Sequence, residues 1–371
     1  KLGVRYDYMQ KRYNLLSPRL SFSARYFEKF RLRLAYGISY KAPSMLQLYP
    51  GPVYFDIINL SHYSEDDYRS LAVVTTNIHQ PTNEHLRPSK GNTLEGGFDF
   101  EHKGFSARVT AFHKKIGNGI SSSEIIKTYE KQIWEVVEQL PNQAPTLAPT
   151  DSSIYVSSKM NYHANSLSST TNGIEFSVQF PKIKATNTSI NLSGNILRTK
   201  TQKTTPRIAS SVSLTGAQRN RYGVYENATY QISTSRSNLT IAQHIPEIKL
   251  LFTLITETNW MYKREIVSLP NPYPLAYYDN RGNYIEIPEN ERSSDTYKDL
   301  YYSPDFDNNT PTPSYFNFHL QVRKETKQGH SFSFYANNFL WHTPTYTDSV
   351  SKTINYLNSR VTFGFGLNFK L

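Results

Sequence analysis

Seven tyrosines stand between Asn271 and Pro313, and their rings are well suited to hold a ligand. An aromatic ring offers a flat apolar face, and the tyrosine hydroxyl adds a polar group at its edge. Such rings stack on sugars, aromatic siderophores or peptides. The alternative is that they pack the segment on itself or lie near lipid head groups. The candidate ligand contacts are Tyr273, Tyr277, Tyr278, Tyr284, Tyr301 and Tyr302.

Two histidines in the polar segment 42–89, His62 and His79, are further candidate ligand contacts. They lack the spacing of metal ligands, and solvated surface histidines are the competing interpretation. The chain has no Cys, which excludes thiolate metal sites and disulfides. No nucleophile elbow, phosphate loop or paired metal-ligand spacing occurs. The sequence therefore predicts no enzyme, no metal site and no cofactor.

Charged side chains recur at every second position of several segments. We expect these positions to face a polar interior, where they attract an anionic ligand or, alternatively, pair with carboxylates in a structural role. The predicted inward residues are Arg5, Arg19, Arg25, Arg31, Arg33 and Glu95.

The elements that must position these residues are strands. From Arg360 to Leu371, apolar residues alternate with polar or small ones without interruption. This period of two is that of a β-strand with one face in an apolar environment and the other in a polar one. About ten such residues, tilted, cross a bilayer. No segment approaches the roughly 18 uninterrupted apolar residues of a spanning helix. A membrane-spanning version of this chain must therefore be a β-barrel.

The formal net charge of +11 would suit a nucleic-acid partner, but the basic residues are dispersed along the segments with no dense run. An interior lining, or contact with anionic lipopolysaccharide and outer-membrane lipid, explains the charge better. We therefore predict no nucleic-acid binding.

Alternation predicts twelve strands, and the connections between them alternate in length. The predicted strands are 1–9, 18–27, 29–41, 90–102, 104–116, 168–181, 186–200, 226–243, 247–263, 314–325, 329–340 and 357–371. Long connections at 42–89, 117–167, 201–225, 264–313 and 341–356 alternate with short turns. Short periplasmic turns and long extracellular loops are typical of bacterial outer-membrane barrels.

Two local patterns add detail. Ser121 and Glu124 have capping-box spacing ahead of apolar residues at helical intervals, which predicts a helix over 121–140. Trp260, Tyr262 and Trp341 fall where strands should leave the membrane, and we expect them to form part of an interfacial aromatic girdle.

Several motifs resemble the barrel of TonB-dependent outer-membrane receptors. These are the Pro-Arg-Leu strand start at Pro18, the Tyr40-Lys41-Ala42-Pro43 strand end, the segment NEHLRPSKGNTLEGG from Asn83, SFSFYANNFL from Ser331, and the terminal strand. Their order and spacing extend the resemblance over essentially the whole chain.

The resemblance implies a plugged barrel of roughly 22 strands that imports a scarce nutrient with energy from TonB. Residues 1–371 would then be its C-terminal portion, with the plug domain and roughly ten N-terminal strands absent. The implied partners are the chain's own plug, the remaining strands, the TonB complex reached through the missing N-terminal part, and a surface lipoprotein. The inward arginines and Glu95 would face the plug. The nutrient would be a siderophore, haem, vitamin, glycan or peptide.

Two other interpretations stay open. The chain is a passive 12-stranded outer-membrane channel or small barrel enzyme, or it is a soluble β-rich adhesin. Because a soluble sandwich has no reason to sort its loops by length, the alternation of connections favours the membrane barrel.

Overall fold

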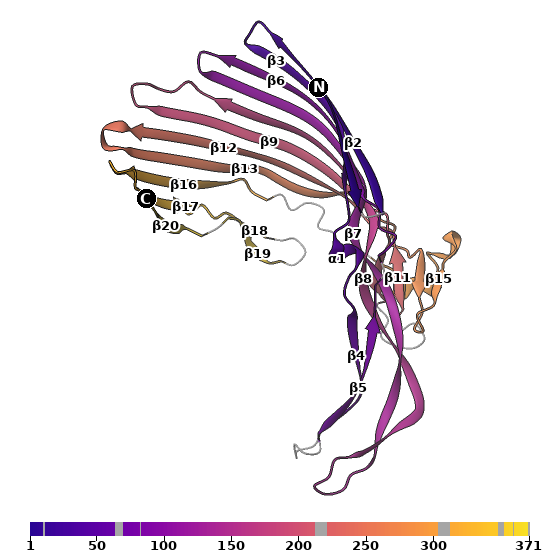
Figure 1. The fold of residues 1–371 in the computed structure, drawn as a ribbon. Coiled ribbons are helices and arrows are strands. Elements are labelled where there is room, and N and C mark those ends of the chain that lie inside the picture. Colours follow the sequence, from indigo (N-terminus) through magenta and orange to yellow (C-terminus); the bar gives the residue numbers. More distant parts are fainter. Residues whose placement is uncertain are drawn as a thin grey trace.

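A computed structural model describes residues 1–9, 12–63, 70–81, 83–211, 221–302, 312–347, 352–358 and 360–369. Its main feature is one antiparallel sheet of twelve strands, bent along its strand order (Figure 1). In spatial order the strands are β1 (Leu2–Met9), β2 (Tyr13–Tyr26), β3 (Phe30–Lys41), β6 (Ser89–His102), β7 (Phe105–Glu138), β8 (Thr146–Gln179), β9 (Thr188–Lys203), β12 (Thr229–Ile245), β13 (Leu250–Ser268), β16 (Tyr315–Glu325), β17 (Ser331–Asn337) and β20 (Thr362–Asn368). All twelve predicted strands are therefore confirmed, in sequence order. Lys370 and Leu371, the end of the predicted terminal strand, lie outside the described residues.

The register keeps one polar and one apolar face continuous across the sheet. On the apolar face, Leu32 pairs with Phe98, Phe98 with Val109, and Val109 with Phe176. On the other face Gly97, next to Phe98, pairs with Arg33. Side chains alternate along each strand, so the alternation in sequence becomes two opposite surfaces.

The sheet has two free edges. Within the described residues, β1 pairs only with β2 and β20 only with β17, so the two end strands of the order are not joined to each other. No helix in the described part of the chain is long and apolar enough to cross a membrane. The longest strands instead run through the sheet and beyond it.

Short turns gather at one end of the sheet and long connections at the other (Figure 1). The turn at Lys103 and Gly104, for example, places both residues at positive φ, 46° and 82°, which suits a tight hairpin. The connection between β1 and β2 is the exception, since it is short and lies at the long-loop end. The predicted long connection 117–167 is instead mostly strand, since β7 continues to Glu138 and β8 starts at Thr146. The predicted alternation in length holds for the other connections.

The helix predicted over 121–140 is wrong. Residues 121–138 belong to β7, which pairs with β8 beyond the twelve-stranded sheet; Ile125 lies opposite Met160, and Tyr129 opposite Val156. β-branched residues are frequent here, and a continuous partner strand satisfies the backbone. The apolar residues that mimic a helical face instead pack across the hairpin and on a neighbouring one, where Phe55 stacks on Tyr129 with ring centroids 5.4 Å apart.

The long connections carry small structures of their own. They comprise α1 (Met45–Leu48), the pair β4 (Val53–His62) and β5 (Leu71–His79), the pair β18 (Thr345–Thr347) and β19 (Ile354–Tyr356), and a four-stranded sheet of β10 (Arg207–Ser210), β11 (Tyr222–Tyr225), β14 (Ala276–Tyr278) and β15 (Tyr284–Glu286). The 3₁₀ helices are η3 (Pro246–Ile248) in a short turn, and η4 (Glu289–Glu291) and η5 (Asp295–Leu300) after β15.

The most deeply buried apolar side chains belong to this four-stranded sheet and its connections, which we call the loop sheet. They include Val224, Tyr225, Ile287 and Leu300, each at most 2% exposed. The twelve-stranded wall has no such core, because both of its faces are open in this chain.

Candidate functional site

The polar face of the wall carries all six residues predicted to point inward. Arg5 forms an ion pair with Asp7 at 2.8 Å, and Arg25 lies directly opposite Arg31. Gly3, on the same face as Arg5, lies opposite Arg19. The structure thus brings these side chains onto one surface.

Arg33 is the best-fixed member of this set. It lies 2.8 Å from a carboxylate oxygen of Asp99, which is almost buried, and it donates to the Thr110 hydroxyl at 3.1 Å. Arg108 approaches the same carboxylate at 3.3 Å. Asp99 therefore bridges two arginines from strands β3 and β7, an arrangement that stiffens the wall.

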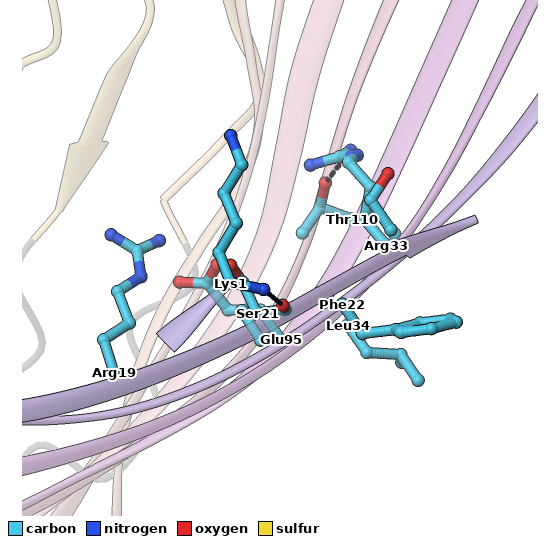
Figure 2. A pocket seen from close by; sticks show the side chains of 11 residues that line it. Lys1, Arg19, Ser21, Phe22, Arg33, Leu34, Glu95 and Thr110 are labelled. Atoms are coloured by element: carbon cyan, nitrogen blue, oxygen red, sulfur yellow. Dashed lines mark hydrogen bonds between the residues drawn. The ribbon is translucent and has the colours of Figure 1, made fainter. Parts of the chain in front are cut away.

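A cavity of about 420 Å³ opens on this face between β2, β3 and β6, lined by Arg19, Arg33 and Glu95 among others. Figure 2 shows these three side chains on one side of the strands and Phe22 and Leu34 on the other. The cavity is polar along one side, as expected for a surface that meets water or a polar partner.

The six candidate tyrosines lie in the loop sheet and its connections, where most of them pair with one another. Tyr278 packs edge-on against Tyr284 with ring centroids 5.3 Å apart, and Tyr273 packs against Tyr301 at 5.7 Å. Burial raises the pKa of Tyr278, and the neighbouring Tyr284 and Tyr162 add to this shift.

The remaining two candidates also have aromatic partners. Tyr277 lies 5.9 Å from Tyr297, and Tyr302 lies 5.1 Å from the buried Tyr225. Of the six, only Tyr284 and Tyr301 are exposed, at 52% and 48%. Most of these tyrosines therefore pack against other aromatic rings of the loop sheet. Tyr284 and Tyr301 keep a surface that a ligand can reach.

The two candidate histidines are not brought together. His62 ends β4 opposite Leu71, whereas His79 ends β5 opposite Val53, so they occupy opposite ends of one hairpin. Burial, followed by the charge of Lys127, lowers the pKa of His79. Among the residues that the structure describes, no group of three or more His, Asp or Glu side chains could hold a metal ion.

The predicted girdle residues fall on different faces. The Trp260 indole donates to the Ser237 hydroxyl at 2.8 Å and packs edge-on against Phe316, so it lies on the apolar face. Tyr262 pairs with Thr234 on the polar face, and the two residues cannot belong to one lipid-facing belt. Trp341 follows β17 and is 64% exposed.

A basic cavity of about 510 Å³ went unrecognised in the sequence. It lies where the strands leave the wall on the long-loop side, and its cations come from four strands: Lys159, Lys203, Arg207 and Arg264. No local sequence motif predicts this cavity, because only the fold brings these residues together. We call it the rim cavity.

The family described as TonB dependent receptor-like, beta-barrel, matches residues 1–339 of the chain. The chain belongs to the TonB-dependent receptor family. The receptor is accordingly an outer-membrane β-barrel protein, and the apolar face of its wall is the face that meets lipid.

Two further comparisons add little to this assignment. No curated protein sequence matches the receptor significantly. Among solved structures, a crystal structure of a Pseudomonas aeruginosa FadL homologue aligns over 96% of the receptor and 77% of that chain, with 9% identity and a TM-score of 0.25. A likeness this low carries no argument about function.

Proposed function

We propose that the chain is the C-terminal part of a plugged barrel that imports a scarce nutrient with energy supplied through TonB. Membership of the receptor family supports outer-membrane transport. The free edges of β1 and β20 support the larger barrel, and they are the observation that carries the proposal.

The edge argument rests on the cost of unpaired backbone. In the hydrocarbon layer every N–H and C=O needs a partner, so a spanning sheet must close. A passive channel made from this chain alone would join β1 to β20, yet within the described residues β1 pairs only with β2 and β20 only with β17. Further strands from the same protein, pairing with β1 on one side and β20 on the other, complete the barrel.

The polar face favours a plug inside that barrel. The side-chain oxygens of Asn195 and Asn317 are buried and have no hydrogen-bond partner within the described part of the chain. Both residues line a cavity of about 590 Å³ on this face. A plug that enters this cavity would supply partners for the polar side chains that line it and for the arginines and Glu95, which we assign to the wall–plug contact.

The long connections are the proposed ligand-binding surface, with Tyr284 and Tyr301 as its accessible rings. The nutrient belongs to the classes named above: siderophore, haem, vitamin, glycan or peptide. We further propose contact with lipopolysaccharide along the apolar face, TonB contact through a part of the protein outside this chain, and a surface lipoprotein as an additional partner.

Growth tests with and without TonB examine this function. The full-length receptor is expressed in a strain that lacks other uptake receptors, and growth is measured on ferric siderophores, haem, cobalamin, oligosaccharides and peptides as sole sources. We expect one class to support growth only when TonB is present. Equal growth in the strain without TonB would instead indicate a passive channel.

The barrel architecture has its own test, because the chain contains no native Cys. Cysteines placed at Tyr6 in β1 and Phe365 in β20 should form no disulfide in the full-length protein, since other strands separate them. Cysteines at Phe334 and Phe365, which pair directly, serve as the positive control. A disulfide between positions 6 and 365 would contradict the proposed architecture.

A further inference from the structure

The rim cavity has the size and position of a small-molecule site. Its volume of about 510 Å³ falls within the range of ligand pockets. Tyr230 and Thr201, which pair with each other and line the cavity, belong to the polar face of the wall. Lipid head groups lie against the opposite face, so the cavity is open to solutes rather than to lipid.

The two lysines of the cavity are fixed by backbone carbonyls. Lys159 donates to the Ile208 carbonyl at 2.6 Å and stands 4.0 Å from a carboxylate oxygen of Glu124. Lys203 donates to the Ser122 carbonyl at 3.0 Å. Since an ammonium group has three donors, each lysine keeps further donors for a ligand.

The guanidinium groups of the two arginines each lie over a tyrosine ring. The guanidinium of Arg207 lies 4.7 Å from the ring centroid of Tyr302, and that of Arg264 lies 4.6 Å from Tyr230. Within the described residues, neither arginine forms a salt bridge. A guanidinium that lies over a ring still has several N–H groups, which can donate two hydrogen bonds to a carboxylate.

Nearby acids do not neutralise the cavity. Glu124 is the only carboxylate among its lining residues, against four cations, so the lining carries three net positive charges. Glu265 follows Arg264 in β13 but faces the other side of the strand, where it lies 2.6 Å from Lys263. The positive charge is therefore available to a bound anion.

We propose that the rim cavity binds a small organic molecule with two or more carboxylate groups. The two stacked arginines supply planar forks for two carboxylates, and the lysines add single charges. The buried Ile208 and Ala228, with the Tyr230 ring, give the cavity an apolar side, which suits a carbon skeleton better than an inorganic anion. This proposal rests on the proposed function and assigns the chemical class of the imported nutrient.

Citrate is the probe for calorimetric titration of the purified full-length receptor. We expect citrate to bind, with an affinity that falls as salt is raised. Arg207→Gln and Arg264→Gln should each weaken binding by about tenfold or more, as expected for the loss of a charge-assisted contact. Arg281→Gln, an exposed arginine of the neighbouring loop outside the cavity, is the matched control and should bind as the wild type does.

Three results would overturn the proposal. These are the absence of citrate binding at millimolar concentration, equal citrate affinity in the Arg207→Gln, Arg264→Gln double variant, and binding of neutral trimethyl citrate or inorganic phosphate as tight as that of citrate. Heat-modifiable migration in gels checks that each variant still forms its barrel.

The growth tests separate this proposal from the proposed function. Citrate binding that depends on the two arginines, together with equal growth with and without TonB, would support the rim cavity as a carboxylate site and refute active transport. Growth that depends on TonB but is unchanged in the double variant, together with the absence of citrate binding, would refute the cavity alone.

Discussion

Arg221 and Asp299 form a buried ion pair that joins two long connections distant in sequence. The Arg221 Nε donates to one carboxylate oxygen of Asp299 at 3.1 Å, and its Nη2 donates to the other. The side chains are only 9% and 4% exposed, and the Arg221 guanidinium also lies 5.0 Å from the centre of the Tyr277 ring. This ion pair therefore links the connection before β11 to the connection after β15 and stabilises the loop sheet between them.

Arg221→Met should destabilise the loop sheet by about 3 to 5 kcal/mol, because it leaves the Asp299 carboxylate buried without a partner. Limited proteolysis of the purified receptor measures this as faster cleavage in the loops while the barrel stays heat-modifiable. The double variant Arg221→Met, Asp299→Leu removes both charges and should regain most of the resistance. A single variant as resistant as the wild type would show that the pair contributes little.

Charged residues on the apolar face of β20 should abolish membrane insertion. Phe363, Phe365 and Phe369 are 64%, 80% and 61% exposed, so their replacement by lysine disturbs little packing. Each charge near the bilayer midplane costs about 2 to 4 kcal/mol. The matched control is Asn368→Lys, on the polar face of the same strand. Normal amounts of heat-modifiable barrel in the triple variant would contradict the assignment of the two faces.

The two ends of the sheet should lie on opposite sides of the outer membrane. An epitope inserted at the exposed Asn271, in the connection after β13, should be labelled on intact cells. An epitope at Lys103, in the turn between β6 and β7, should be labelled only after permeabilisation. The reverse pattern would invert the proposed orientation.

Acid should loosen the β4–β5 hairpin. Burial, followed by the charge of Lys127, lowers the pKa of His79 below its ordinary value of 6.5. The undocked hairpin therefore takes up a proton more readily, and its docking weakens as the pH falls below about 6.5. Hydrogen exchange, corrected for its intrinsic pH dependence, should show this loss of protection. His79→Gln should remove the effect, whereas His62→Gln, at the far end of the hairpin, should retain it.

Alternation in the sequence was sufficient to predict the wall, because a strand with one face in lipid repeats every two residues. Phe112 interrupts that pattern, since it stands on the polar face. The structure supplies the reason: the ring covers Gly173 on the next strand, where an added Cβ would come within 2.5 Å of it. An aromatic residue over a cross-strand glycine fills the space that the glycine leaves.

The segment 121–140 shows where local patterns fail. Its capping-box spacing and apolar intervals fit a helix, and its β-branched residues fit a strand. What decides is a partner in 146–167 that pairs with it residue by residue, as Ser123 does with Tyr162. A pattern read along one segment contains no information about such a partner.

The surroundings of the candidate ligand contacts were the hardest to predict for the same reason. A count of tyrosines does not reveal that Tyr273 and Tyr278 lie against other tyrosines. The rim cavity depends on residues from four strands, and Arg264 lines it whereas the neighbouring cation Lys263 lies on the other face of the strand. Sequence reasoning therefore predicted the scaffold well and the cavity not at all.

The free edges of β1 and β20 also affect the tendency of the chain to aggregate outside the membrane. Each edge presents a row of unpaired N–H and C=O groups, flanked by apolar side chains such as Leu2 and Phe365 that are more than three-quarters exposed. Such an edge is a template for strand addition between molecules. Residues 1–371 produced alone should therefore associate edge to edge.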